Sequence, residues 1–429
     1  MSLRALFAFA GIAFCLSGIL HAEVPADKTL SVILAPEGGT DRASIEIARC
    51  QERALRPGAT AQDFERLGWA FIAKARRTLD AGYYALAEKT AQVITARFGE
   101  NPDALLLRGH ALHNLHRFAE AEAIARKLTA TRDVSLDWAL LSDALMEQGK
   151  LSAAVDACQQ FTNRKPGLEA YSRIAHLRWL KGDLDGAIEA MTSAVRSGGA
   201  RDDEAVAWSL ARLSLFVLQK SRAADSLALA EDALERVPGF APALLSRGRA
   251  LLALDRADDA VAPLREAARE NPLPEYQWWL ADALRATGSD ESATVETSLE
   301  RRGPFSDPRT TSLFLATRGF SPDIAAQLAG DELANRVDVF THDANAWALV
   351  RDGRDADALR EMRAALAEGT QDARLFFHAG VILAANSQQK EAHEYFARAA
   401  AMSATLTPGE RSLLNEYRGH PAGSSAATP

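Results

Sequence analysis

Histidine is the residue type whose spacing in this sequence first suggests chemistry. The stretch "HALHNLH" contains His110, His113 and His116, and imidazole nitrogens are common ligands of transition metals. His110 and His113 share a helical face and are the candidate metal ligands, and Asp143 and His176 extend the His110 row. Packed helices lie about 10 Å apart, so neighbouring rows reach one ion only if side chains stretch across. A polar patch in contact with water explains the same spacing, and both interpretations stay open.

Signatures of other catalytic sites are missing from the sequence. It contains no G-x-S-x-G, no H-E-x-x-H, no phosphate-binding glycine loop and no thiol beside a plausible base. Acidic residues such as Asp183, Asp185 and Asp258 fall at expected helix starts, where carboxylates stabilise the first backbone N–H groups. We therefore expect a protein that is not an enzyme and that needs no cofactor.

The first residues predict export. Arg4 is followed by an apolar stretch over residues 5–20 and by Ala22, the pattern of a signal peptide over residues 1–22. The stretch is shorter than the roughly 20 residues of a spanning helix, and no second one follows, so we expect no stable membrane insertion after cleavage. The formal net charge of −8 becomes −9 without Arg4, which disfavours nucleic acid as a partner. The expected location is periplasmic or extracellular.

A small residue that opens an apolar helix recurs about every 34 residues. The positions are Ala87, Ala121, Ala154, Ala187, Ser226, Ala260, Ala293, Ala358 and Ala392, with a weaker unit around Ala325. Five residues before each stands a residue suited to a tight or left-handed turn. These are Gly82, His116, Gly149, Gly182, Ser221, Asp255, Gly288, Gly353 and Ser387, with Gly319 in the weaker unit. Each unit is therefore predicted to be a helix, a turn and a helix.

This combination of period, turn and small residue resembles the tetratricopeptide repeat (TPR). The chain is also similar to exported bacterial members of that class, for which no common reaction is known. The resemblance implies an all-α fold, a right-handed α-solenoid superhelix of about ten units over residues 61–402. Residues 23–60 would hold a capping helix at 44–55, and residues 403–429 a helix remnant and a flexible tail.

In this family the first helix of each unit lines a concave groove in which partners usually lie. Stepping back 15, 11 or 8 residues from the recurring small residue selects one stripe of that helix. The resulting candidates for partner binding are His110, His113, Asp143, Met146, His176, Trp179, Arg249, Trp278, Asp282 and Trp347. The three tryptophans are either anchors for a partner, because buried tryptophan dominates many interfaces, or packing between units.

These features favour an exported scaffold that binds protein or peptide partners through the groove, in an assembly associated with the cell envelope. The alternative is a ligand-binding protein, with a glycan on the groove tryptophans or a metal at the His110 and His113 row. Cys50 and Cys158 lie on units too far apart for a disulfide, so we expect two buried thiols.

Overall fold

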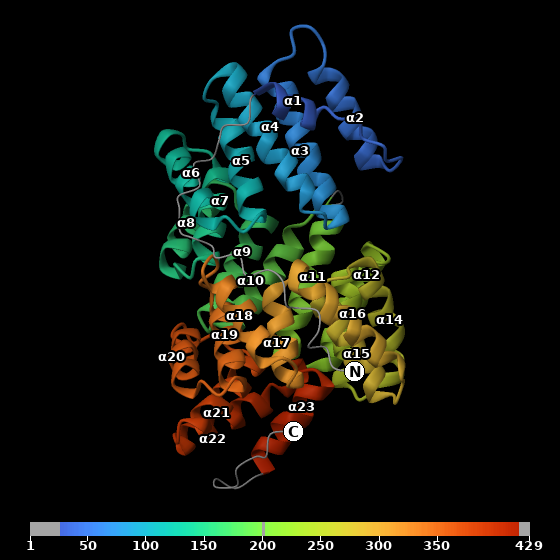
Figure 1. Ribbon diagram of the computed structural model, residues 1–429, viewed down its shortest axis with the longest axis vertical. Helices are drawn as coiled ribbons and strands as arrows, with labels where there is room; N and C mark the ends of the chain where they lie inside the picture. The colour runs from blue at the N-terminus through green and yellow to red at the C-terminus, as the bar shows by residue number, and fades with distance from the viewer. Residues whose placement is uncertain (1–25, 200–201, 420–429) are drawn as a thin grey trace, which may run out of the picture.

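The chain is a stack of helical hairpins in a computed structural model that describes residues 26–199 and 202–419 (Figure 1). The described residues contain α-helices, one short 3-10 helix and no strand. None of these helices combines the length and the apolar character that crossing a bilayer requires. The predicted signal peptide and the last ten residues of the tail lie outside the described residues.

Ten consecutive helix pairs form the body of the molecule, which confirms the all-α solenoid and the number of units. The pairs are α3 (Ala61–Thr78) with α4 (Gly82–Phe98), α5 (Pro102–Asn114) with α6 (Phe118–Thr131), α7 (Ser135–Glu147) with α8 (Leu151–Arg164), α9 (Leu168–Leu180) with α10 (Leu184–Ser197), α11 (Asp203–Gln219) with α12 (Ala223–Arg236), α13 (Ala241–Ala253) with α14 (Ala257–Glu270), α15 (Pro274–Ala286) with α16 (Glu291–Ser306), α17 (Pro308–Arg318) with α18 (Pro322–Leu333), α19 (Val339–Arg351) with α20 (Asp355–Leu366) and α21 (Ala373–Ala385) with α22 (Gln389–Ala401).

Short helices flank the ten pairs at both ends. At the start are α1 (Ala26–Ile33) and α2 (Arg42–Ala54), and Gln51 ties them by donating to the carbonyls of Ile33 and Ala35. The buried ammonium of Lys74 bonds Asp41 and Ser44, which joins α2 to the first pair. At the other end, η2 (Ser403–Thr405) and α23 (Pro408–Gly419) follow the last pair. Part of the predicted tail is therefore helical.

The predicted turn residues adopt the left-handed conformation in nine of the ten units. Glycine does so in some units, whereas His116, Ser221, Asp255 and Ser387 do so with φ between 56° and 63°. Gly82 is the exception and the prediction for it is wrong, because Gly82 begins α4 and Leu79 takes the positive φ of 58° instead. The first turn comes early because Thr78 ends α3 and a short loop precedes α4.

The recurring small residues are buried where the two helices of a unit cross. Nine of the ten positions are 0% exposed, Ser226 among them. The prediction for Ala293 is wrong: this alanine is exposed on α16, and Ser292 takes the buried position beside it. The register of that unit is therefore shifted by one residue, which turns Ala293 to solvent.

Ala187 and Ala293 make a matched pair for testing this packing. Ala187→Leu should lower the free energy of unfolding by about 1–3 kcal/mol, because extra methyl groups must enter a filled crossing. Ala293→Leu adds the same atoms at an exposed position and should change stability little. Chemical denaturation of the two variants checks this, and equal midpoints would contradict the assigned register.

The superhelix closes on itself, because the second to fifth helix pairs contact segments about five to six pairs further along the chain. In Figure 1 the orange helices α17–α19 lie in front of the green helices of the middle units. Arg336 forms an ion pair with Glu147 at 2.5 Å, and Lys181 donates a hydrogen bond to Glu368 at 2.6 Å. Further along, Ser221 Oγ donates to the carbonyl of Ala401 at 2.9 Å. Successive turns of the superhelix thus meet along a seam.

Two glycines let the backbones approach at this seam. A Cβ on Gly149 would lie 2.2 Å from the carbonyl oxygen of Val337, and one on Gly182 would lie 2.5 Å from that of Gly369. The seam is sealed by Thr370, whose hydroxyl donates to the carbonyl of Leu180 at 2.5 Å. Side chains at these two turns would hold the successive superhelical turns apart.

Cys50 and Cys158 are both buried and free, as the unit separation predicts. Burial raises the pKa of each thiol, so both stay protonated and pack as small apolar groups.

Candidate functional site

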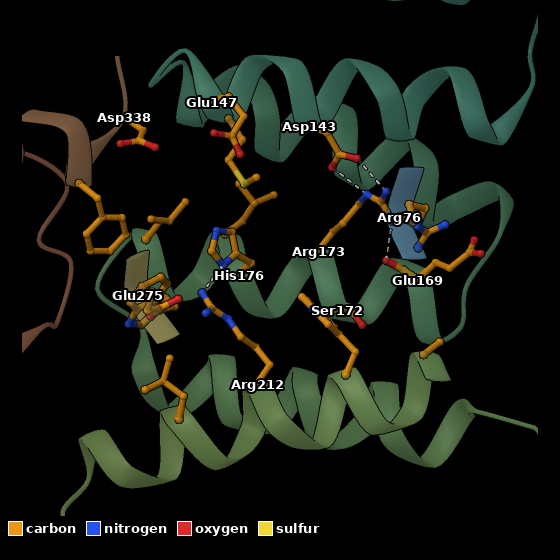
Figure 2. A pocket seen from close by; sticks show the side chains of 18 of the residues that line it. Arg76, Asp143, Glu147, Glu169, Ser172, Arg173, His176, Arg212, Glu275 and Asp338 are labelled. Carbon is orange, nitrogen blue, oxygen red and sulfur yellow. Dashed lines mark hydrogen bonds and ion pairs between the residues drawn. The ribbon is translucent and has the colours of Figure 1, made fainter. Parts of the chain in front are cut away.

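The inner surface of the closed superhelix surrounds a cavity of about 1300 Å³. Its walls come from the first helices of the units, from α3 through α15 on one side and from α17, α19 and α21 on the other. Helices far apart in the sequence face one another here because the second superhelical turn rests on the first. Figure 2 shows part of the lining, with Asp143, Arg173, His176 and Arg212 directed inward.

The cavity opens mainly at α3 and at the first turns of α7, α9 and α11. Exposed lining side chains there include Arg76, Leu136, Glu169 and Trp208. Trp208 is 43% exposed and Leu136 38% exposed, although both are large and apolar. We name this region, lined by Ala73, Arg76, Leu136, Glu169 and Trp208, the mouth of the cavity.

Ion pairs cross the cavity wall between neighbouring units. Arg173 binds Asp143 with two hydrogen bonds of 2.7 and 2.8 Å, drawn in Figure 2. Burial alone would raise the pKa of Asp143, but the guanidinium of Arg173 lowers it below its usual value. Arg249 binds Glu275 across α13 and α15 with one hydrogen bond, from Nη2 to Oε1. Both pairs fix the orientation of adjacent first helices.

A second group of ion pairs joins the two turns of the superhelix. Asp338 accepts from Arg309 at 3.0 Å and from Arg336 at 2.8 Å, while Arg336 also reaches Glu147. Burial acts to raise the pKa of Asp338, and the two guanidinium groups keep it lowered. The cavity wall and the seam are therefore parts of one charged network.

His176 and Arg212 form a different kind of contact. Arg212 donates from Nη2 to Nδ1 of His176 at 3.1 Å, so the imidazole accepts at Nδ1 and carries its proton at Nε2 (Figure 2). Burial lowers the pKa of His176 to about 3, with Arg212 acting in the same direction. Burial also lowers the pKa of Arg212 to about 10. The pair is thus a neutral imidazole beside a cation.

Six of the ten candidate residues line this cavity. They are His110, Asp143, Met146, His176, Trp179 and Arg249. Trp179 is only 4% exposed, stacks on Phe340 at 5.0 Å and donates to the carbonyl of Gln371 at 3.2 Å. From the sequence alone, Trp179 could either pack between units or contact a partner. The structure places its indole in the seam.

The other four candidates do not line the cavity. Trp278 and Trp347 are each 1% exposed, and Asp282 is buried in an ion pair with Arg318. His113 packs edge-on against the ring of Phe118. A later segment covers the inner face of α15, where the N–H of Gly409 at the start of α23 donates to Asp282 at 3.3 Å. The chain therefore does not form an open groove along every unit.

The histidine row does not assemble into a metal centre in the described part of the chain. No group of three or more His, Cys, Asp or Glu side chains among these residues is placed to hold an ion. His110 packs against Trp69 at 5.3 Å, and burial lowers its pKa to about 4. His116 faces Glu332 across the seam, with Nδ1 and Oε1 3.6 Å apart.

Several lining residues escaped the sequence-based selection. Arg173 and Arg212 lie fourteen residues before Ala187 and Ser226, one position from the chosen stripe, and Trp208 lies a further turn back. A wider stripe would have included them. Phe340 and Arg374 enter the cavity only because the superhelix closes, and no local pattern signals that.

The neutral histidines predict how stability depends on pH. His110 and His176 have folded pKa values of about 4 and about 3, against 6.5 for a free imidazole. The unfolded chain therefore binds more protons between these values, and the free energy of unfolding should fall as pH falls from 6.5 toward 4. Denaturation at about pH 7 and about pH 5 measures this loss. The double variant His110→Asn, His176→Asn should lose less unfolding free energy between these two pH values than the parent. His393→Asn, at an exposed position of α22, should lose as much as the parent. Equal losses in the parent and in both variants would contradict the assignment.

Comparison with known proteins relates part of the chain to a family. The tetratricopeptide repeat family matches residues 139–213 and 217–273. No curated protein sequence matches the chain.

Solved structures that resemble the chain include three helical-repeat proteins. MamA is 19% identical with a TM-score of 0.32, covering 41% of this chain and 94% of its own. A tetratricopeptide repeat protein from Parabacteroides merdae is 16% identical with a TM-score of 0.32, covering 58% and 98%. A monomeric mutant of IFIT1 with Gppp-AAAA is 11% identical with a TM-score of 0.48, covering 87% and 99%. At these scores the likeness says nothing about function. Residues 139–213 and 217–273 thus match the tetratricopeptide-repeat family, and all ten helix pairs share the helix-turn-helix architecture of these segments.

Proposed function

We propose that this protein is an exported scaffold that binds a protein or peptide segment at the mouth of its cavity. Tetratricopeptide-repeat proteins bind protein partners. The observation that carries the proposal is Trp208, a large aromatic residue on the inner wall that stays 43% exposed. The other first-helix tryptophans are less exposed: Trp69 and Trp138 are partly buried, and Trp179, Trp278, Trp279 and Trp347 are buried. An exposed aromatic side chain at the rim of a concave surface is a typical anchor for a partner.

The chemistry of the mouth suits an extended segment of mixed character. Leu136 and Trp208 supply apolar contact, and Arg76 and Glu169 supply charges of both signs. A segment that lies across α7, α9 and α11 would meet Leu136, Glu169 and Trp208 in turn. The closed seam keeps a folded domain out of the deeper cavity, so we infer that a short or unfolded segment enters.

Selection from a library of displayed short random peptides tests the proposal. Peptides that bind the parent chain should lose about 2 kcal/mol or more of binding free energy in Trp208→Ala, as truncated hot spots do. Phe305→Ala is the control, because Phe305 is 92% exposed on α16 and does not line the cavity. Failure to select any peptide, or equal effects of the two variants in titrations, would contradict the proposal.

The export part of the proposal rests on the sequence of residues 1–22. N-terminal sequencing of protein from its native cells should start near Glu23. A start at Met1 in a cytosolic fraction would refute export.

A further inference from the structure

Arg212 stands out among the cations of the cavity that are not exposed, because it has no carboxylate partner within the described part of the chain. Arg76 and Arg77 on α3 also line the cavity without such a partner, but both are exposed. Arg212 donates from Nη2 to neutral His176 at 3.1 Å, and its Nε is buried without an acceptor among the described residues. The guanidinium carbon lies 5.0 Å from the Trp179 ring centre and 5.4 Å from that of Phe216. Aromatic faces and a neutral imidazole thus surround a charge that burial makes costly.

The other arginines of the inner cavity are all neutralised. Arg173, Arg249 and Arg309 bind Asp143, Glu275 and Asp338, in that order, and Arg336 shares Asp338. Arg374 binds the buried carboxylate of Glu410 with two hydrogen bonds. This leaves Arg212 as the guanidinium without a carboxylate partner among the described side chains that line the inner cavity. Asp343 and Asp372 line it too, and they bond to His378 and to Gln219 and backbone N–H groups rather than to an arginine.

Two carboxyl groups near Arg212 are already engaged elsewhere. Glu275 is bonded to Arg249, and Asp372 accepts from the backbone N–H groups of Arg374 and Leu375 at the start of α21. Their attraction for Arg212 acts through space rather than through a hydrogen bond. The Nε of Arg249 is also buried without an acceptor among the described residues, so a second donor faces the same region.

Apolar side chains complete the walls around these donors. Trp179, Leu215, Phe240, Leu313 and Phe340 line the cavity on both superhelical turns. A cavity of about 1300 Å³ is far larger than one acid group needs and exceeds the roughly 300–1,000 Å³ of typical small-molecule sites, so a small organic molecule would fill only part of it. The lining therefore places an arginine without a carboxylate partner beside apolar side chains.

We propose that the inner cavity binds a small-molecule monocarboxylate with an apolar body, whose carboxylate accepts hydrogen bonds from Arg212 and whose body lies against Trp179 and Phe340. A carboxylate matches the planar fork of a guanidinium group. A single guanidinium without a partner favours a monoanion, and the nearby Glu275 and Asp372 disfavour a dianion such as a phosphate ester. This site lies deeper than the mouth and goes beyond the proposed binding of a peptide.

Decanoate and its neutral analogue decanamide are suitable probes for titration calorimetry with the full chain. Decanoate should bind with a dissociation constant below about 1 mM, and decanamide should bind at least about tenfold more weakly. Arg212→Met keeps the apolar stem and should weaken decanoate binding at least about tenfold. Arg178→Met, at an exposed position on α9, should leave the affinity unchanged.

Thermal melts without ligand separate a binding role from a structural one. Arg212→Met should leave the melting temperature unchanged or raise it, because the variant removes a buried charge that has no carboxylate partner. Arg173→Met should lower it, because Asp143 then loses its cation. A marked drop in the melting temperature of Arg212→Met would overturn the proposal, since Arg212 would then be a packing residue.

Two variants distinguish this site from the peptide site. Trp208→Ala should keep the affinity for decanoate, and Arg212→Met should keep the affinity for the selected peptides. Three results would each overturn the inference: loss of decanoate binding in Trp208→Ala, decanoate binding that survives in Arg212→Met, or no decanoate binding by the parent chain. None of them decides the peptide proposal, which has its own test.

Discussion

Trp179→Ala is expected to lower the free energy of unfolding by about 3–5 kcal/mol, the usual cost of truncating a buried aromatic side chain. The indole is 4% exposed and lies between Phe216 on the next unit and Phe340 on the next superhelical turn. Its Nε1 donates to the carbonyl of Gln371 at 3.2 Å, and the guanidinium of Arg212 lies over its face. Removing the ring opens a hole where three segments meet.

Two other variants show which part of Trp179 matters. Trp179→Phe keeps most of the packing and loses the hydrogen bond to Gln371, so it should cost less than the alanine variant. Trp208→Ala removes the same side chain from an exposed position and should change stability little. Thermal melts and chemical denaturation measure all three. If Trp179→Ala and Trp208→Ala melt together, Trp179 does not fill the seam.

Gly182→Ala should be more destabilising than the same change at Gly288. Both glycines have positive φ, 81° and 74°, so alanine is strained at either position. At Gly288 the new methyl group meets no atom within 4 Å, whereas at Gly182 it would lie 2.5 Å from the carbonyl oxygen of Gly369. Backbone must therefore move at the seam, at an additional cost of about 1–3 kcal/mol.

Hydrogen exchange identifies where that cost arises. In Gly182→Ala the amides of residues 366–372 should exchange faster than in the parent, because the loop between α20 and α21 is pushed off the turn at Gly182. Gly288→Ala should leave those amides unchanged. Equal unfolding free energies and equal exchange in the two variants would contradict a tight contact between superhelical turns.

The sequence predicts the repeat well because each unit carries its own signals. A small residue at the helix crossing and a turn residue five positions earlier are local requirements, and they locate Ala187 and Gly182 correctly. The two failures have local causes as well. Leu79 accepts the strained turn in place of Gly82, and the α16 register is shifted so that Ser292 replaces Ala293 inside.

The site is predicted less well because it depends on long-range contact. The stripe of first-helix residues correctly includes His110, Asp143 and His176, whose neighbours are in adjacent units. Small rotations between units add up over the array, and they decide whether successive superhelical turns touch. Nothing in the sequence near Trp347 or Asp282 reports that later segments cover these residues.

The closed seam also changes where a partner can bind. An open solenoid would offer the inner faces of all ten units, whereas here α15, α17 and α19 contribute largely to buried contacts. Binding is confined to the mouth and to molecules small enough for the cavity. Both proposals therefore depend on the contact between superhelical turns.

Zero-length coupling with a carbodiimide, followed by peptide mapping, tests that contact most directly in the unmodified chain. Lys181 Nζ and Glu368 Oε2 are 2.6 Å apart across the seam, although 187 residues separate them in the sequence. Lys220 and Asp185, 2.7 Å apart on neighbouring units, form the internal control, because any solenoid of this register brings them together. The account predicts an isopeptide link between Lys181 and Glu368 within one chain. A link between Lys220 and Asp185 without one between Lys181 and Glu368 would contradict the closed superhelix.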